Sequence, residues 1–421
     1  MSEGKKLSKE VVVSLSEPVI FHGMIENWSV LKWELKDWSS VFGERKLPFR
    51  CGVKSCSPDP LWEGKCSKEM MTLEEFCSLK LEHTEPTEDG MKWFYFDYQQ
   101  ISDWTSAEIN DLISIKWDAF GFPEKGAEDS TIWIGSEGAH TPCHFDTYGC
   151  NLVAQVIGTK RWILFPHEDM KDMRPTRVPY EESSVYSLWN FNCPLPSEFY
   201  SRRNCKAYIV DLKPGDVLFV PRHWWHYVES LDFSISINTW LPTNPEDDVS
   251  RLDEAFVQLL ISQVSKNLST DEKSKILNPN ENDVVLFDLQ HSASIISHCA
   301  NNVKQFRRKC SELKEPPAKQ LKMESSDQIE LSSLLEMGNA KLVSSCNSEQ
   351  LRSLMDTTCS CASKERHAMA MTQRQASDFN SHVKNLINAF CHPDIVAQVR
   401  EKFNDVFVLD DHQTTDSETF V

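Results

Sequence analysis

Short runs of hydrophobic residues recur through the middle of the chain, and turn signals interrupt them. Between residues 131 and 241 the runs are TIWIG, NLVAQVIG, KRWILFP, AYIVDL, DVLFVP and SISINTWLP. They are rich in β-branched and aromatic residues, and Gly158–Thr159, Lys213–Asp216 and Pro242 interrupt or end them. Strands of this kind, with Gly and Pro turns and no helical repeat between them, are typical of an antiparallel sandwich or barrel. The pattern predicts a β core at residues 131–245.

Residues 1–130 mix helical and extended patterns. The stretch EVVVSLSEPVIFHG predicts a helix that leads to a short strand at Val19–Phe21, with Pro18 at the boundary. Thr72 followed by Glu75 and apolar positions predicts a capped helix, and MKWFYFDYQQI predicts a strand. We expect this part to be an α/β extension of the core.

After residue 245 the apolar positions change to helical spacing. A helix is predicted at 250–265 and a second at about 282–310, both within a helical segment at 246–312. The polar stretch at 313–376 contains paired prolines and predicts a linker without regular structure. The segment at 377–421 predicts two short amphipathic helices, broken at His392–Pro393, and a polar tail.

Charge and cysteine content narrow the class of protein. The chain has 421 residues and a formal net charge of −19, which disfavours general nucleic-acid binding. Its apolar runs are all shorter than the roughly 18 residues that a membrane helix needs, and no signal peptide is recognisable. The 14 cysteines show no framework of spacings, so we expect reduced thiols and a cytoplasmic protein, with the nucleus as a second compartment.

The stretch HTPCHFDTYG at residues 140–149 carries the first candidate metal ligands. On a strand, His144 and Asp146 point to the same face, so both can meet one ion. A distant stretch, VPRHWWHYVES, offers His223 and His226; being three apart, they face opposite ways, and one of them would complete the set. Two histidines, one carboxylate and open positions form the facial triad of non-haem Fe(II) oxygenases.

Two other interpretations of these residues stay open at this point. Histidines near tryptophans are also common as packed core residues whose ring nitrogens are hydrogen-bonded. A zinc site would use Cys143, Cys150, His140 and His144, but Cys143 is next to His144 and would point away from its face of the strand.

Longer motifs add a family resemblance. In order, WIGSEGAHTPCHFDTYGCNLVAQVIGTKRWILFP, GDVLFVPRHWWHYVES and SISINTW resemble the jumonji-C family of Fe(II)- and 2-oxoglutarate-dependent oxygenases, and above all its asparaginyl-hydroxylase branch. The resemblance covers about residues 10–265. It implies a mainly β fold with α: a double-stranded β-helix core of the jelly-roll or cupin type, an N-terminal α/β extension and C-terminal helices. The implied cofactor is Fe(II), with 2-oxoglutarate as cosubstrate and O₂ as oxidant.

The resemblance assigns roles to individual residues. It places His144, Asp146 and His226 in the metal triad, where they are also the catalytic residues. Lys160 matches the lysine that binds the distal carboxylate of 2-oxoglutarate, and Thr141 matches the hydroxyl that shares it. An inward lysine is consistent with this role because a buried ammonium requires an anion.

Four further positions match the cosubstrate pocket. Asn151 and Asn238 match asparagines that flank iron and cosubstrate, and both lie in apolar strands where an amide needs a polar partner. Trp240 matches an aromatic wall, for which core packing is an equally good explanation. Tyr95 is preferred over Tyr98 as the tyrosine that reaches the 2-oxoglutarate carboxylate, although the motif around both departs from the family pattern.

One loop also departs from the pattern. The spacing from Asp146 to Asn151 is one residue longer than in the asparaginyl hydroxylase, and this predicts a bulge at Gly149. His140 and His223 match no family role, and we expect them to be structural or at the surface.

The resemblance implies a function and a partner. The expected reaction is hydroxylation of a protein side chain. HTPCH, YGCNLV, PTRVPYEESSV and VLFVPRHWWHYVES resemble a group in the branch that is associated with a 27-kDa small heat-shock protein. The alternative is a weakly catalytic or non-catalytic adaptor that binds such a protein in the stress response. The predicted 252–264 helix resembles dimer-forming helices of the branch, so a homodimer is expected, whereas histone-lysine demethylation is disfavoured because no reader module is recognisable.

Overall fold

The computed structural model describes most of the chain, as two compact units. The described residues are 6–54, 57, 59–82, 92–106, 109, 112–194, 206–278, 286–312, 330–358 and 379–415. We call the first unit the β unit; it contains the described residues of 1–174, 187–242 and 324–375. We call the second the helical unit; it contains those of 175–186, 243–323 and 376–421.

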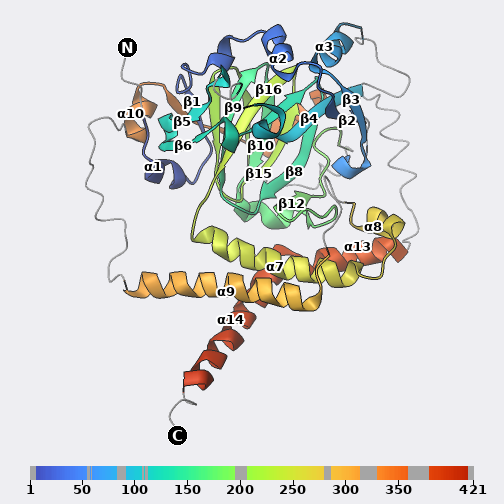
Figure 1. The fold of residues 1–421 in the computed structure, drawn as a ribbon, viewed down its shortest axis with the longest axis vertical. Coiled ribbons are helices and arrows are strands. Elements are labelled where there is room, and N and C mark those ends of the chain that lie inside the picture. The colour runs from blue at the N-terminus through green and yellow to red at the C-terminus, as the bar shows by residue number, and fades with distance from the viewer. Residues whose placement is uncertain are drawn as a thin grey trace. The chain divides into compact units, whose positions relative to one another are not determined.

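Two antiparallel sheets form the centre of the β unit (Figure 1). The first sheet has the order β17 (Ala340–Leu342), β1 (Val19–His22), β14 (Asp216–Val220), β9 (Cys150–Ile157), β16 (Ser234–Leu241), β7 (Thr131–Gly135), β4 (Lys92–Gln100), β2 (Leu47–Val53) and β3 (Ser67–Met71). Within this unit, the second sheet has the order β8 (His140–Asp146), β15 (Trp225–Ser230), β10 (Lys160–Phe165), β13 (Ala207–Leu212) and β18 (Ser345–Cys346). A separate pair joins β5 (Lys116–Trp117) and β6 (Phe122–Gly126).

Successive strands of the core alternate between the two sheets. The chain passes from β7 in the first sheet to β8 in the second, to β9 in the first and to β10 in the second. The strands β13 to β16 alternate in the same way. This alternation makes a double-stranded β-helix, so the predicted fold class is confirmed.

Two hydrophobic clusters explain why these runs are apolar on both faces. Residues from both sheets, such as Val153, Trp162 and Val228, form one cluster. A larger cluster joins residues of the first sheet, such as Ile235 and Phe219, to the N-terminal extension. A strand that is covered on both sides reads as a continuous apolar run, as NLVAQVIG does.

The N-terminal extension has the predicted mixture of elements. The predicted helix, strand, helix and strand correspond to α1 (Lys9–Val13), β1, α3 (Leu73–Glu82) and β4. The remaining helices and 3₁₀ turns of the β unit are η1 (Ser29–Lys32), α2 (Leu35–Phe42), η2 (Glu63–Lys65), α4 (Ile101–Trp104), η3 (Asp118–Phe120), η4 (Ala127–Asp129), η5 (His167–Met173), α10 (Leu331–Glu336) and α11 (Ser348–Thr358).

Part of the predicted linker at 313–376 is structured, which corrects that prediction. Residues 330–358 form α10, β17, β18 and α11, and β17 pairs with β1 while β18 pairs with β13. Leu334, Leu351 and Met355 are buried. Their apolar side chains dock these short elements on the β unit, although the surrounding sequence is polar. The residues 313–329 and 359–376 of the predicted linker lie outside the described residues.

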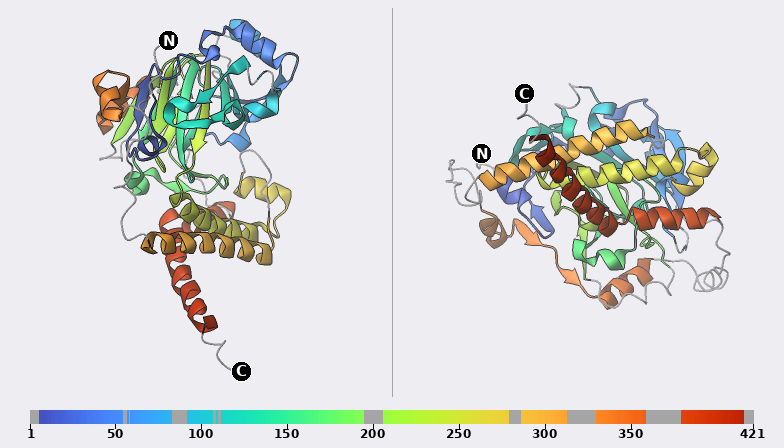
Figure 2. Two further views of the ribbon diagram at one scale, coloured as in Figure 1. Left: turned by 60° about the vertical axis from the view of Figure 1, so that its left-hand side comes forward. Right: turned by 90° about the horizontal axis from the view of Figure 1, so that it is seen from below.

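The helical unit contains the predicted C-terminal helices. They are α7 (Glu246–Ser265), α8 (Thr270–Ile276), α9 (Leu289–Glu312), α13 (Phe379–Phe390) and α14 (Pro393–Thr415). The two longest of the first three, α7 and α9, run alongside each other (Figure 2). The break before Pro393 is where the sequence predicts it. No helix in the described part of the chain meets the length and hydropathy that crossing a membrane requires.

A buried ion pair organises the start of the helical unit. Residues 175–186 hold β11 (Pro175–Thr176) and most of β12 (Ser184–Ser187). Between them, Arg177 pairs with Glu254 of α7 and also donates to the Ser184 carbonyl oxygen. Both charged side chains are almost fully buried. Because a buried charge without its partner is costly, this pair ties the loop to α7.

The cysteines are in two states. Among those whose state the structure describes, Cys51, Cys66, Cys77, Cys143, Cys150, Cys299, Cys346 and Cys391 are free. Cys193 is disulfide-bonded, so the expectation of reduced thiols is wrong for this residue.

Glycines in the left-handed conformation allow the chain to cross between sheets. Gly149 has φ +63° and lies in the connection between β8 and β9, where a Cβ would be 2.4 Å from the Leu241 carbonyl oxygen. The predicted bulge at Gly149 is therefore wrong: this residue ends a loop between two sheets. Gly158 has φ +66° and lies between β9 and β10.

The tightness of the second crossing predicts the effect of a single methyl group. In Gly158→Ala, the new Cβ would lie 1.9 Å from the Phe233 carbonyl oxygen. We expect the free energy of unfolding to fall by roughly 3 kcal/mol, through strain and overlap together. Gly215→Ala is the matched control, because Gly215 has φ +89° with nothing within 4 Å. It should cost only about 1–2 kcal/mol in urea unfolding, and equal losses in the two variants would contradict this account.

Candidate metal centre

The three predicted metal ligands lie on two neighbouring strands of the second sheet. In the antiparallel pairing of β8 with β15, His144 is directly opposite His226. Residues opposite each other in a ladder point to the same face. Asp146, two residues along β8, also faces this side. The ligating atoms of all three lie within 4.8 Å of one another, and no other such group exists among the described residues.

Backbone carbonyls fix the tautomer of both histidines. His144 Nδ1 is 2.9 Å from the Pro142 carbonyl oxygen, and His226 Nδ1 is 2.9 Å from that of Trp224. A carbonyl oxygen only accepts, so Nδ1 carries the proton in each ring and Nε2 keeps its lone pair. Burial, followed by the neighbouring His144, lowers the pKa of His226 to about 4. His226 thus presents a neutral nitrogen, as a metal requires.

Asp146 supplies the carboxylate of the group. Burial alone would raise its pKa, but contacts with His144 and His226 and a hydrogen bond from Trp240 hold the pKa below its usual value. Its Oδ1 is 3.5 Å from His144 Nε2, whereas its Oδ2 accepts from Trp240 Nε1 at 2.8 Å. Two neutral imidazoles and an ionised carboxylate are a donor set for a divalent transition metal.

A bulge in β8 brings Thr141 to the same face as the ligands. His144 pairs with His226 but Thr141 pairs with Val228, so three steps on β8 match two steps on β15. The extra residue falls at Pro142–Cys143, and a proline inside a sheet is tolerated at such a bulge. Without the bulge, Thr141 would face away from His144, because the two are an odd number of residues apart.

Lys160 is a buried cation close to these residues. It is 1% exposed, and its Nζ donates to Tyr95 Oη at 3.1 Å and to Ser236 Oγ at 2.7 Å. Burial lowers the pKa of Lys160 to about 7, although the negative charge of Asp97 acts in the opposite direction. Lys160 pairs with Ser230 and Leu164 pairs with His226 across β10 and β15, so the lysine and the metal ligand share one sheet face.

The inner face of the first sheet supplies an amide chain. Trp133 Nε1 donates to Asn238 Oδ1 at 2.7 Å, and Asn238 Nδ2 donates to Asn151 Oδ1 at 3.0 Å. Both asparagines are buried, as the sequence predicts for amides with polar partners. On β16, Ser236, Asn238 and Trp240 are two residues apart and point to the same side.

The structure separates the two tyrosines that the sequence leaves open. Tyr95 is buried and contacts Lys160, and it is also hydrogen-bonded to Thr141. Tyr98 is 36% exposed and packs against Trp133 and Trp240 instead. Only Tyr95 is placed to reach a ligand of Lys160.

Neighbouring histidines and cysteines have other contacts. His140 is buried, its Nδ1 is hydrogen-bonded to the Gly138 carbonyl oxygen, and burial lowers its pKa to about 3. His223 Nε2 donates to the Thr147 carbonyl oxygen at 3.1 Å. Both are structural, as expected. Cys143 and Cys150 are outside the group of converging ligand atoms, and this removes the support for the zinc alternative.

Two contributors were missed in the sequence. Ser236 accepts from Lys160, and Trp133 holds Asn238. Ser236 could have been predicted from the sequence, because it is a polar residue two positions before Asn238 in an apolar strand. Trp133 could not, since an aromatic residue in TIWIG fits a core position equally well.

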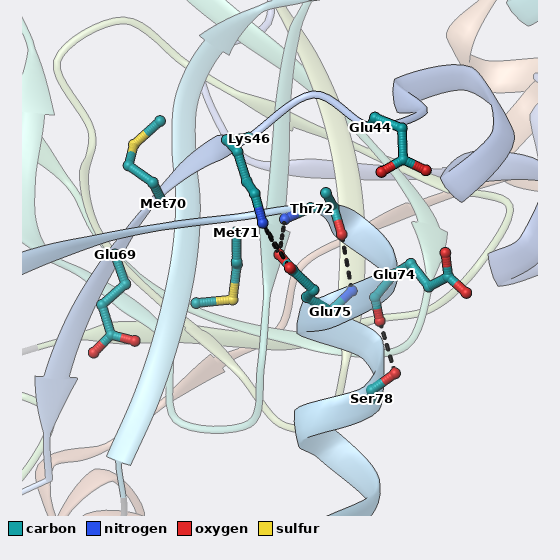
Figure 3. A pocket seen from close by; sticks show the side chains of 9 residues that line it. All are labelled: Glu44, Lys46, Glu69, Met70, Met71, Thr72, Glu74, Glu75 and Ser78. Carbon is teal, nitrogen blue, oxygen red and sulfur yellow. Dashed lines mark hydrogen bonds and ion pairs between the residues drawn. The ribbon is translucent and has the colours of Figure 1, made fainter.

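A surface hollow elsewhere in the β unit contains none of the predicted site residues. It has a volume of about 700 Å³ and lies at β3 and the start of α3 (Figure 3). Some of its polar groups already have partners: Glu75 accepts from the Thr72 backbone N–H at 2.6 Å and from Lys46 Nζ at 2.6 Å. Thr72 Oγ1 in turn accepts from the Glu75 backbone N–H at 3.1 Å, which completes a capping box. The hollow thus reflects how α3 begins.

Comparisons with known proteins identify a family and several relatives of the chain. The family model of the cupin-like domain matches residues 5–247. HSPB1-associated protein 1 of Homo sapiens is 42% identical over 281 residues, which are 65% of this chain and 57% of the human protein. The HSPB1-associated protein 1 homolog of Danio rerio is 38% identical over 304 residues, 70% of this chain and 67% of that protein. Lysine-specific demethylase 8 of Xenopus tropicalis is 27% identical over 229 residues, 53% of this chain and 48% of that protein. The match thus spans less than two thirds of the human relative.

The buried lysine predicts an unusual effect on stability. The pKa of Lys160 is lowered to about 7 in the folded state, whereas an unfolded chain has the ordinary lysine pKa of 10.5. Between these two pH values Lys160 is protonated in the unfolded chain but not in the folded chain. Wild-type stability should therefore rise with pH in this range. Lys160→Met should raise the free energy of unfolding at pH 7 by about 2 kcal/mol and reduce that pH dependence.

Urea unfolding at pH 7 and pH 9 measures this effect. Lys213→Met, at an exposed lysine, is the control and should leave both values within about 0.5 kcal/mol of wild type. A Lys160→Met protein that is less stable than wild type at both pH values would show that Lys160 stabilises the fold.

Proposed function

The chain belongs to the cupin-like domain family, which confirms the resemblance found in its sequence, and we propose that it is an Fe(II)- and 2-oxoglutarate-dependent oxygenase that hydroxylates a protein side chain. The observation that carries the proposal is the convergence of His144, Asp146 and His226, with buried Lys160 on the same sheet face.

The donor set suits iron. His144 Nε2, His226 Nε2 and one oxygen of Asp146 would hold the ion. Three protein ligands leave positions for a cosubstrate and O₂, whereas structural zinc sites are closed by four ligands. When bound, Fe(II) together with 2-oxoglutarate and O₂ supplies the oxidising chemistry that hydroxylates a C–H bond.

The surroundings of Lys160 suit a short dicarboxylate. Lys160 is four residues along β10 from Leu164, the partner of His226, which is roughly 13 Å of strand. The side chains of Lys160 and His226 are on the same face of the sheet, so we infer that a small diacid would bind between them. Trp162, on the same face, contacts His226, and its buried indole N–H has no hydrogen-bond partner among the residues that the structure describes. A buried donor of this kind is consistent with a bound polar ligand.

The residues of the pocket would each do a limited task. Lys160 would take up a proton and pair with the distal carboxylate, while Tyr95 and Thr141 would donate hydroxyl hydrogen bonds to it. Asn151 and Asn238, already ordered by Trp133, would keep polar groups beside the iron. We also propose that the protein is located in the cytoplasm, with the nucleus as a second compartment.

The metal triad can be tested with one substitution. Asp146→Ala should weaken Fe(II) binding at least 100-fold and abolish conversion of 2-oxoglutarate to succinate, because two neutral histidines alone hold the ion poorly. Anaerobic titration with Fe(II) and succinate detection measure both effects.

The control removes a carboxylate outside the site. Asp271→Ala, at an exposed position on α8, should bind Fe(II) and turn over 2-oxoglutarate like wild type. A folded wild-type protein that binds neither Fe(II) nor 2-oxoglutarate would refute the proposal.

A second candidate function is supported by the names of the relatives. The human and zebrafish relatives are called HSPB1-associated, so we propose a small heat-shock protein as partner, either as substrate or as the client of an adaptor. The two roles differ in whether they need the metal centre.

Binding to a purified 27-kDa small heat-shock protein separates the roles. An adaptor should bind with the same affinity, within about twofold, in wild type and in Asp146→Ala, because the triad takes no part. A substrate should gain one hydroxyl, detected by mass spectrometry, only with wild type. If the small heat-shock protein binds neither wild type nor Asp146→Ala, the proposal of this partner is refuted.

A further inference from the structure

Three aromatic side chains pack together, and one of them contacts the carboxylate of the metal triad. The Tyr98 ring lies 5.6 Å from the Trp240 ring and 5.8 Å from the Trp133 ring, measured between centroids. Trp240 is the member that touches the triad, through its hydrogen bond to Asp146 Oδ2. Tyr98 therefore packs against both indole rings.

The hydrogen bond from Trp240 makes the two oxygens of Asp146 unequal. Oδ2 accepts the indole N–H at 2.8 Å, whereas Oδ1 is the oxygen 3.5 Å from His144 Nε2. An indole nitrogen is a donor only, so its proton must be directed at the carboxylate. A carboxylate can bind a metal through one or both oxygens, and a hydrogen bond to Oδ2 favours binding through Oδ1 alone.

Tyr98 adopts a conformation that its own sequence does not favour. Its φ is +54°, in the left-handed region that a residue with a Cβ rarely occupies. The strain arises from a bulge, because Asp97 and Tyr98 on β4 lie opposite the single residue Trp133 on β7. Strain of this kind persists where the surrounding structure enforces it and is common near functional sites.

The other residue of the bulge anchors it. Asp97 accepts from Arg50 Nε at 2.7 Å, and Arg50 is only 3% exposed. Arg50 also donates to the His140 carbonyl oxygen of β8 at 3.0 Å. The bulge is thus tied to the strand that carries His144 and Asp146, and this fixes where the Tyr98 ring can lie.

We propose that Trp240 is a positioning residue that holds Asp146 as a one-oxygen metal ligand, and that the bulge at Asp97–Tyr98 serves to hold Trp240 in that position. The inference rests on the proposed metal centre. It extends the role of Trp240 from a pocket wall to the control of coordination. A second bound oxygen of Asp146 would occupy a position that the cosubstrate or O₂ needs.

Co²⁺ binding to the full-length protein tests this inference without catalysis. Trp240→Phe keeps a ring against Tyr98 but removes the donor to Asp146, so Co²⁺ affinity should fall about tenfold or more. The visible d–d bands of bound Co²⁺ should also change, because Oδ2 becomes free to coordinate. Trp189→Phe is the matched control, since its indole donates to the Asp172 carbonyl oxygen at 2.7 Å, and it should match wild type in affinity and spectrum.

A second variant tests the bulge. Tyr98→Asn places a residue that tolerates positive φ and removes the ring. Its Co²⁺ affinity should fall at least threefold and its spectrum should shift toward that of Trp240→Phe, while its thermal midpoint stays at or above the wild-type value. Loss of thermal stability without an effect on Co²⁺ would show that Tyr98 is only structural and would overturn its part in the proposal.

The outcomes distinguish this inference from the proposed function. If wild type binds Co²⁺ and Trp240→Phe has the same affinity and spectrum, the inference is overturned and the metal centre stands. If wild type binds no more Co²⁺ than Asp146→Ala, both are overturned. Weakened, spectrally altered binding in Trp240→Phe and Tyr98→Asn, with Trp189→Phe unchanged, supports the inference.

Discussion

The register between β8 and β15 is the constraint on which the candidate metal centre depends. It sets His144 opposite His226, and the single extra residue at Pro142–Cys143 turns Thr141 to the same face. A shift of one residue would send the histidines to opposite faces, because side chains alternate along a strand. The backbone carbonyls of Pro142 on β8 and of Trp224, the residue just before β15, then orient both imidazole rings. The geometry of the centre is therefore a property of the ladder and needs no flexible loop.

The two sheets also bury the side chain of Lys160, a cation whose charge the fold does not neutralise. Lys160 has hydroxyl partners, Tyr95 and Ser236, but no carboxylate of the described residues lies within ion-pair distance of it. Burial lowers its pKa, so the surroundings of Lys160 in the folded chain disfavour its charged form. A buried, unneutralised cation of this kind lowers stability, which is a common feature of functional sites. The bulge at Asp97–Tyr98 likewise holds local strain, next to the Trp240 ring that hydrogen-bonds Asp146.

The sequence predicted the strands of the core well, because each is covered on both faces and its apolar run is long. It failed for β17 and β18, which are two or three residues long and take their stability from docking on β1 and β13. The triad followed from spacing and resemblance together. Spacing alone could not choose between His223 and His226, and regular alternation would have placed Thr141 on the wrong face. The position of Trp240 against Asp146 could not be predicted, because it depends on how two different sheets approach each other.

A crystal structure with Mn²⁺ and 2-oxoglutarate, prepared without O₂, tests the central claim most directly. If the proposed metal centre is correct, we expect one anomalous scattering peak about 2.0–2.3 Å from His144 Nε2, Asp146 Oδ1 and His226 Nε2. We also expect the distal carboxylate of 2-oxoglutarate to contact Lys160 Nζ. Saturating Mn²⁺ with no ion at these three residues, or a cosubstrate carboxylate bound away from Lys160, would contradict the central claim.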